Sequence, residues 1–183
     1  MTLRCLSSLS TIAILTLCGI TRVTAESIVD PLPQCCQVRA TDRRIIAAVA
    51  AGVRASPTFR ALVDRINTSD VVVYVTAESG EMPSGLDGQL TFVSAVGGFR
   101  YVLVRVNSQL SAARLVSLIG HELQHAREIA DAEWIVDPAS MAREYVRTLG
   151  YRSRNQSQQH QMFDTAAAVR AGEQVLRELM KGE

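Results

Sequence analysis

The residues with the clearest chemical potential are His121, Glu122 and His125, which belong to the sequence HELQH. On an α-helix, residues four apart project from the same face, so the two imidazoles can bind one Zn²⁺ ion. The glutamate beside the first histidine lies next to such an ion without binding it, where it can take a proton from the attacking water. The spacing therefore predicts zinc-assisted hydrolysis with Glu122 as the general base.

The element that must position this motif is a helix over residues 111–130, which the apolar periodicity predicts independently of the motif. The apolar residues fall on one stripe, and the two histidines lie on the opposite side. Because the chain has only 3 histidines and two of them are here, we expect a metal site rather than two imidazoles on a solvated face. The stripe consists of Leu115, Val116, Ile119, Leu123, Ala126 and Ala130.

A catalytic zinc site needs a third protein ligand, and the sequence offers four candidates. Glu128 shares the face of the histidines but lies a turn farther on, so we favour it as the hydrogen-bond partner of an imidazole. Glu144 lies on the next predicted helix and has Arg147 as an alternative partner. Asp164 enters a buried helix start, where a metal would neutralise its charge and a helix N-cap is the competing role. His160 lies in a polar loop and is also a candidate donor to the transition state.

HELQH on a helix, followed by a carboxylate on a later helix, resembles the zincin metallopeptidases of the gluzincin type. The sequence is most similar to a group of small, exported, uncharacterised bacterial zincin-like proteins. Their pattern runs HELQHA-x-E, then Tyr followed by an Ile/Leu-Gly pair, then F-E-T-x-A-A before a closing helix. The matching segments here are 121–128, Tyr145 with 149–150, and FDTAAA at 163–168. The similarity covers residues 111–180.

The resemblance implies a zincin-like fold and a zinc site made of His121, His125 and Asp164. Aspartate stands where the pattern has glutamate, and because its side chain is one methylene shorter, the helix must approach closer or the metal must shift. In zincins the strand before the active-site helix offers its edge to an extended peptide, which implies this role for residues 99–106. Catalysis also needs a donor to the developing oxyanion. The candidates for this donor are His160, Tyr145 and Tyr151.

The order of elements predicts an α+β fold, in which a small mixed or antiparallel sheet packs against the HExxH helix and further helices. Gly97-Gly98 predicts a hairpin between the last two strands. Residues 26–42 contain two prolines and predict an irregular lead-in. The predicted helices are 43–54, 57–67, 111–130, 138–149 and 162–180, the strands are 70–77, 89–96 and 100–107, and the loops are 79–88 and 151–161.

Residues 1–25 have the layout of a secretory signal peptide, with Arg4, an apolar stretch, and small residues before Glu26. The apolar stretch is short and contains several Ser and Thr residues, which favours removal over a membrane anchor. Residues 26–183 would then form a single domain, secreted or periplasmic. Cys35 and Cys36 are adjacent and cannot form an ordinary intrachain staple, so their state stays open among reduced, bridged to each other, and paired between chains.

The composition argues against several kinds of partner. Lys+Arg (19) nearly equals Asp+Glu (18), and aromatic residues are 5% of the chain, so we expect neither a basic groove nor a base-stacking platform for nucleic acid. No membrane partner is expected after removal of the signal peptide. The oligomeric state is open.

The favoured function is a secreted zinc-dependent peptidase, an endopeptidase rather than an exopeptidase, that acts on a peptide or protein substrate. The alternative is a non-catalytic, metal-containing binding protein on a zincin scaffold. Glu122 favours the peptidase, because a site that only binds metal has no need of a base. A third hypothesis is a helical interaction module in which HELQH is fortuitous, and absence of stoichiometric zinc would select it.

Overall fold

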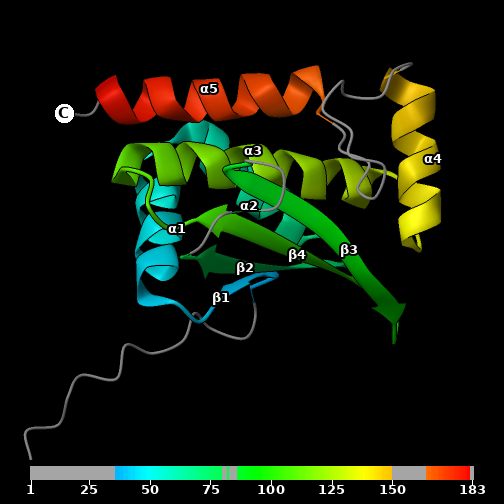
Figure 1. Ribbon diagram of the computed structural model, residues 1–183. Coiled ribbons are helices and arrows are strands. Elements are labelled where there is room, and N and C mark those ends of the chain that lie inside the picture. The colour runs from blue at the N-terminus through cyan, green and yellow to red at the C-terminus, as the bar shows by residue number, and fades with distance from the viewer. Residues whose placement is uncertain (1–35, 80–81, 83–85, 150–163, 182–183) are drawn as a thin grey trace, which may run out of the picture.

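The computed structural model describes residues 36–79, 82, 86–149 and 164–181. These residues form a mixed four-stranded sheet and five helices, which confirms the predicted α+β class (Figure 1). The elements are β1 (Val38–Ala40), α1 (Arg43–Ala55), α2 (Pro57–Asn67), β2 (Val71–Glu78), β3 (Gly88–Val96), β4 (Phe99–Asn107), α3 (Ala112–Asp131), α4 (Pro138–Leu149) and α5 (Ala166–Lys181).

Most predicted elements are found within two residues of their expected ends. The exception is the closing helix, predicted from residue 162, which begins at Ala166. The predicted signal peptide, the loop at 151–161 and Cys35 lie outside the described residues.

The lead-in predicted over residues 26–42 is wrong at its end, where Val38–Ala40 form β1. This strand pairs in parallel with β2, with Val38 opposite Val73. Three residues are too few to show the alternation that marks a strand in a sequence. Residues 38–40 therefore form a strand because they pair with β2, and their own sequence pattern does not predict it.

The sheet has the order β1-β2-β4-β3, with β2 and β4 parallel and β3 and β4 antiparallel. The predicted hairpin is confirmed: Gly97 and Gly98 have φ values of 61° and 80°, which a two-residue turn of this hand requires. Because β4 is paired on both sides, the implied substrate edge at residues 99–106 is wrong. The antiparallel β3 folds back outside β4 and is the edge strand on that side.

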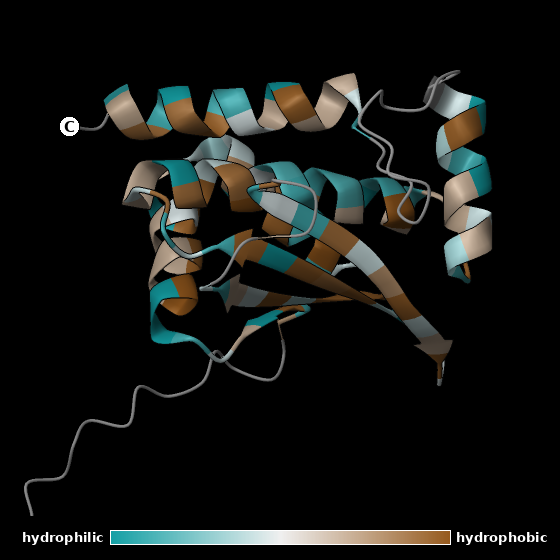
Figure 2. Cartoon of the chain, in the orientation of Figure 1, coloured by the Kyte–Doolittle hydropathy of each residue, from teal (hydrophilic) through white to brown (hydrophobic). Residues whose placement is uncertain are grey.

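The helix α3 lies between the sheet and α5, as Figure 1 shows. Its apolar stripe is buried as predicted and packs with the inward-facing side of β4, where Val102, Val104 and Val106 are fully buried. In Figure 2 the central strands are largely brown, whereas α5 alternates brown and teal as an amphipathic helix does. In this arrangement the face of α3 that carries the histidines points toward α5 and the segment before α5.

Two polar contacts fix the helices that carry the site. Arg100 on β4 is 4% exposed, and its guanidinium donates to both carboxylate oxygens of Asp70 at 2.6 and 2.7 Å. The same guanidinium donates to the carbonyl oxygens of Ile129, Ala132 and Ile135, so β4 holds the C-terminal end of α3.

At the other end of the core, Glu178 on α5 binds the N-terminus of α2. Its carboxylate accepts hydrogen bonds from the Ser56 hydroxyl and from the backbone N–H and hydroxyl of Thr58. Burial alone would raise the pKa of Glu178, but the hydrogen bonds from Ser56, Gln174 and Thr58 together lower it to about 2. The ionised carboxylate therefore ties α5 to α2.

In the part of the chain that the structure describes, no single helix has both the length and the apolar character needed to cross a membrane. The pair α1 and α2 passes that test only jointly, by length and composition, and is bent by 111° at the break.

Candidate metal centre

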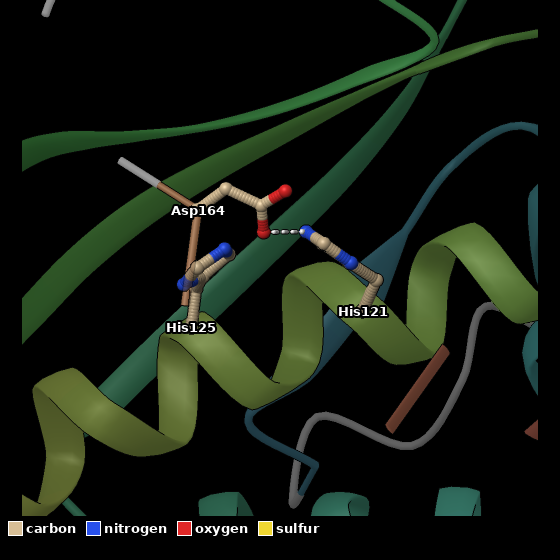
Figure 3. Close-up of side chains that lie close together, drawn as sticks. All are labelled: His121, His125 and Asp164. Carbon is tan, nitrogen blue, oxygen red and sulfur yellow. Dashed lines mark ion pairs between the residues drawn. The ribbon is translucent and has the colours of Figure 1, made fainter. Parts of the chain in front are cut away.

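The structure brings His121, His125 and Asp164 together, although Asp164 is 39 residues from the second histidine in the sequence (Figure 3). One ligand atom from each residue lies within 4.8 Å of the other two. The Nε2 atom of His121 is 3.4 Å from Oδ1 of Asp164. Ligands bound tetrahedrally to zinc at about 2.0–2.2 Å are about 3.3–3.6 Å apart, so this pair already has the required separation.

The orientation of His125 is set by Glu128, one turn farther along α3. Nδ1 of His125 is 3.0 Å from Oε2 of Glu128. Burial would raise the pKa of Glu128, but the hydrogen bond from His125 and further hydrogen bonds lower it, so the carboxylate is ionised and accepts. The ring therefore donates through Nδ1, which leaves Nε2 for a metal. This contact is the role that the sequence favoured for Glu128.

A second group completes the surroundings of Glu128. The hydroxyl of Tyr145 on α4 is 3.2 Å from Oε2 of Glu128 and 3.4 Å from Nδ1 of His125. Burial and the charge of Glu128 raise the pKa of Tyr145, so the hydroxyl keeps its proton and donates it. Tyr145 thus orients Glu128 and His125, and its role as the oxyanion donor stays a prediction.

The two imidazoles differ electrostatically. Burial, followed by the charge of His125, lowers the pKa of His121, so its imidazole is neutral at neutral pH and has a lone pair for a metal. Burial would also lower the pKa of His125, but Glu128 and the nearby acids outweigh it and raise that pKa. His125 therefore binds its proton more tightly than His121 does, and a metal that binds to His125 has to displace this proton.

Asp164 does not cap the helix that follows it, because its neighbour Thr165 does. The Thr165 hydroxyl accepts from the backbone N–H of Ala168 at 3.0 Å and donates to Oε1 of Glu128 at 2.7 Å. Asp164 itself is 55% exposed, not buried as its apolar neighbours suggested. Its carboxylate is left to face the histidines, with one side open to solvent.

Glu122 lies on the sheet side of the same turn and is 4% exposed. Burial raises the pKa of Glu122 to about 7, although the charge of His125 opposes this shift. Strand β3 begins directly beside it: a Cβ atom on Gly88 would lie 2.8 Å from Oε1 of Glu122 and 2.8 Å from Leu118. Only glycine lets the edge strand approach the carboxylate this closely.

Glu144, a further candidate ligand, lies on α4 and is not part of this group. Its carboxylate accepts from Arg147 at 2.6 Å and from Nε1 of Trp134 at 2.9 Å. The hydrogen bond from Arg147, supported by that from Trp134, lowers the pKa of Glu144 to about 2. The competing role assigned to Glu144, a charge paired with Arg147, is therefore the one observed. His160 and Tyr151 lie outside the described residues.

A pocket of about 300 Å³ opens beside His121, between α3 and α5. We call it the α3–α5 pocket. Its walls are mainly apolar, and Arg114 lies at the N-terminal end of α3 within it. It runs from the candidate metal centre toward the start of α3. Its lining consists of Asp87, Leu110, Arg114, Ser117, Leu118, His121, Val169, Gly172, Glu173 and Leu176.

Comparison with known proteins assigns no relative: no family model, no curated protein and no solved structure matches this chain.

Sequence reasoning missed three residues that shape the site. Thr165 precedes an alanine run, which is an N-cap signal, although only Asp164 is considered for this role from the sequence. Gly172 lies inside a helix, where glycine is unfavourable and usually has a packing reason. Gly88 ends the loop predicted over residues 79–88, and only the fold shows that it lies against Glu122.

Proposed function

We propose that this chain is an exported zinc-dependent peptidase in which His121, His125 and Asp164 bind the metal. The observation that carries the proposal is the convergence of these three side chains beside the buried carboxylate of Glu122. Three protein ligands leave a fourth position for water or substrate, as in catalytic rather than structural zinc sites. When bound, zinc polarises the scissile carbonyl and lowers the pKa of water.

Glu122 is the residue that moves the proton. Its pKa of about 7 suits a group that first accepts a proton from water and then passes it to the leaving amine at neutral pH. No described residue donates a hydrogen bond to its carboxylate, so its proton-accepting oxygens are not engaged by a described protein donor. Glu128 and Tyr145 hold His125 in place and take no part in the proton transfer.

The substrate is a peptide that binds in an extended conformation along β3. The outer edge of this strand has no partner among the described strands, and it begins next to Glu122. Backbone groups on such an edge bind a peptide by strand addition. The α3–α5 pocket opens beside His121 and would take a side chain next to the scissile bond.

The test is cleavage of a peptide library by the purified protein, with the Glu122→Gln variant beside it. We expect zinc-dependent cleavage that Glu122→Gln abolishes while zinc remains bound, because glutamine keeps the shape but accepts no proton. Zinc binding without cleavage in the wild-type protein would contradict the peptidase and leave the metal-containing binding protein.

A further inference from the structure

The helices α3 and α5 pack unusually closely at glycine residues. A Cβ atom added to Gly172 would lie 3.2 Å from Cβ of His121 and 3.3 Å from the carbonyl oxygen of Ser117. One added to Gly120 would lie 2.9 Å from Cγ2 of Val175. The Ser117 hydroxyl also donates to the carbonyl oxygen of Gly172 at 2.8 Å. Helix separation depends on the side chains at the contact, so glycines here bring the two axes together.

This contact lies at the candidate metal centre itself. Gly172 packs on His121, and the same helix leads back in about two turns to Thr165 and Asp164. Thr165 caps the helix and binds Glu128, so Asp164 is held by a continuous, hydrogen-bonded segment. A displacement of α5 at Gly172 is therefore passed on to the carboxylate of Asp164.

The distances show that such a displacement would matter. Carbon atoms in ordinary contact are about 3.5–4.0 Å apart, so a methyl group at Gly172 requires a shift of about 0.3–0.8 Å from the 3.2 Å position. Metal–ligand distances tolerate deviations of only about 0.2 Å. Aspartate has a single methylene and cannot extend to follow the shift, whereas glutamate reaches about 1.5 Å farther.

We propose that Gly172 is a positioning residue: it sets the α3–α5 separation at which an aspartate, rather than a glutamate, is the third metal ligand. This inference rests on the proposed zinc site. It explains how a shorter acid serves at position 164, because the helix approaches closer. Gly120 on α3 has the matching role, because its lack of a side chain lets Val175 of α5 approach closely.

The experiment is a double-mutant cycle on zinc affinity, measured by competition with a chromophoric chelator. The variants are Gly172→Ala, Asp164→Glu and the two combined. We expect each single change to weaken zinc binding by about tenfold or more. The combined variant should bind at least about fivefold more tightly than the product of the single effects, because the longer carboxylate spans the wider gap. Additive effects, or wild-type affinity in Gly172→Ala, would overturn the proposal.

Two controls distinguish the spacing role of Gly172 from an effect on protein stability and from failure of the proposed zinc site. Alanine is favoured over glycine inside a helix, so a change confined to helix stability would raise the melting temperature without weakening zinc binding. If Gly172→Ala does not fold, Gly120→Ala is compared with Gly120→Ala/Val175→Ala, in which the smaller side chain restores space. Tighter zinc binding in that double variant supports the spacing role, and equal binding refutes it. Asp164→Ala tests the zinc site alone: if it binds zinc like the wild type, the proposed site fails and this inference fails with it.

Discussion

Replacement of Thr165 by valine tests whether the metal centre and α5 are joined through one hydroxyl. Valine has nearly the same shape, but it removes the cap to Ala168 and the hydrogen bond to Glu128. Loss of an N-cap costs about 1 kcal/mol, and loss of a hydrogen bond to a charged group costs about 1.5–3 kcal/mol. Since Thr165 is only 6% exposed, water cannot replace these bonds freely. We expect the free energy of unfolding to fall by about 2.5–4 kcal/mol.

The assay is urea unfolding of the zinc-free protein, with Thr165→Ser as the matched control. Serine keeps both hydrogen bonds and loses one methyl group, which should cost about 1 kcal/mol or less. An unchanged denaturant slope would show that the difference is one of stability and not of a changed unfolded state. If Thr165→Val and Thr165→Ser have the same free energy of unfolding, the hydroxyl does not link α5 to Glu128.

Three further predictions concern the groups around the site. Gly88→Ala should lower kcat by about tenfold or more with zinc still bound, because the new methyl group displaces the Glu122 carboxylate. An unchanged kcat in the cleavage assay would contradict this. Arg100→Met should lower the free energy of unfolding by about 2–4 kcal/mol, measured in urea, because it leaves three carbonyl oxygens without their buried donor, while Asp70 is partly exposed and can be solvated; Arg100→Lys should lose less. Acid unfolding should depend on Glu178, whose pKa of about 2 lies below its ordinary value of 4.5. The ionised carboxylate contributes its full stabilisation above about pH 5, and this contribution is lost as the pH falls toward 2. Glu178→Gln should therefore make the free energy of unfolding less dependent on pH across that range, and an unchanged pH profile would contradict this role.

Much of the fold follows from local patterns in the sequence. The helices α1 to α4 were predicted because each has an apolar face at helical spacing and a clear boundary, such as Pro57 or Pro138 at the first position. The hairpin followed from Gly97-Gly98. The order of strands did not follow, because nothing local distinguishes a strand paired on both sides from an edge strand. The resemblance therefore pointed to an edge at residues 99–106, whereas β4 is paired on both sides and β3 is the outer strand of the described sheet.

In the candidate site, too, some residues could be predicted from local spacing and others only from the fold. His121, Glu122 and His125 lie on one helix, so their spacing alone predicts their common position. Asp164 is brought to them by packing of α5 on α3, and the sequence reached it through family resemblance while Glu144 remained open. The partners of Glu128 come from α4 and from the start of α5, so only the fold could show them.

The most direct test of the proposed metal centre is the zinc content of the purified protein, measured beside Asp164→Ala and Glu144→Ala. We expect about one zinc per chain in the wild type, since the three ligands form one site, with loss in Asp164→Ala and retention in Glu144→Ala. Loss in Glu144→Ala with retention in Asp164→Ala would contradict the ligand assignment. Absence of zinc from the wild-type protein, purified without chelators, would contradict the metallopeptidase itself.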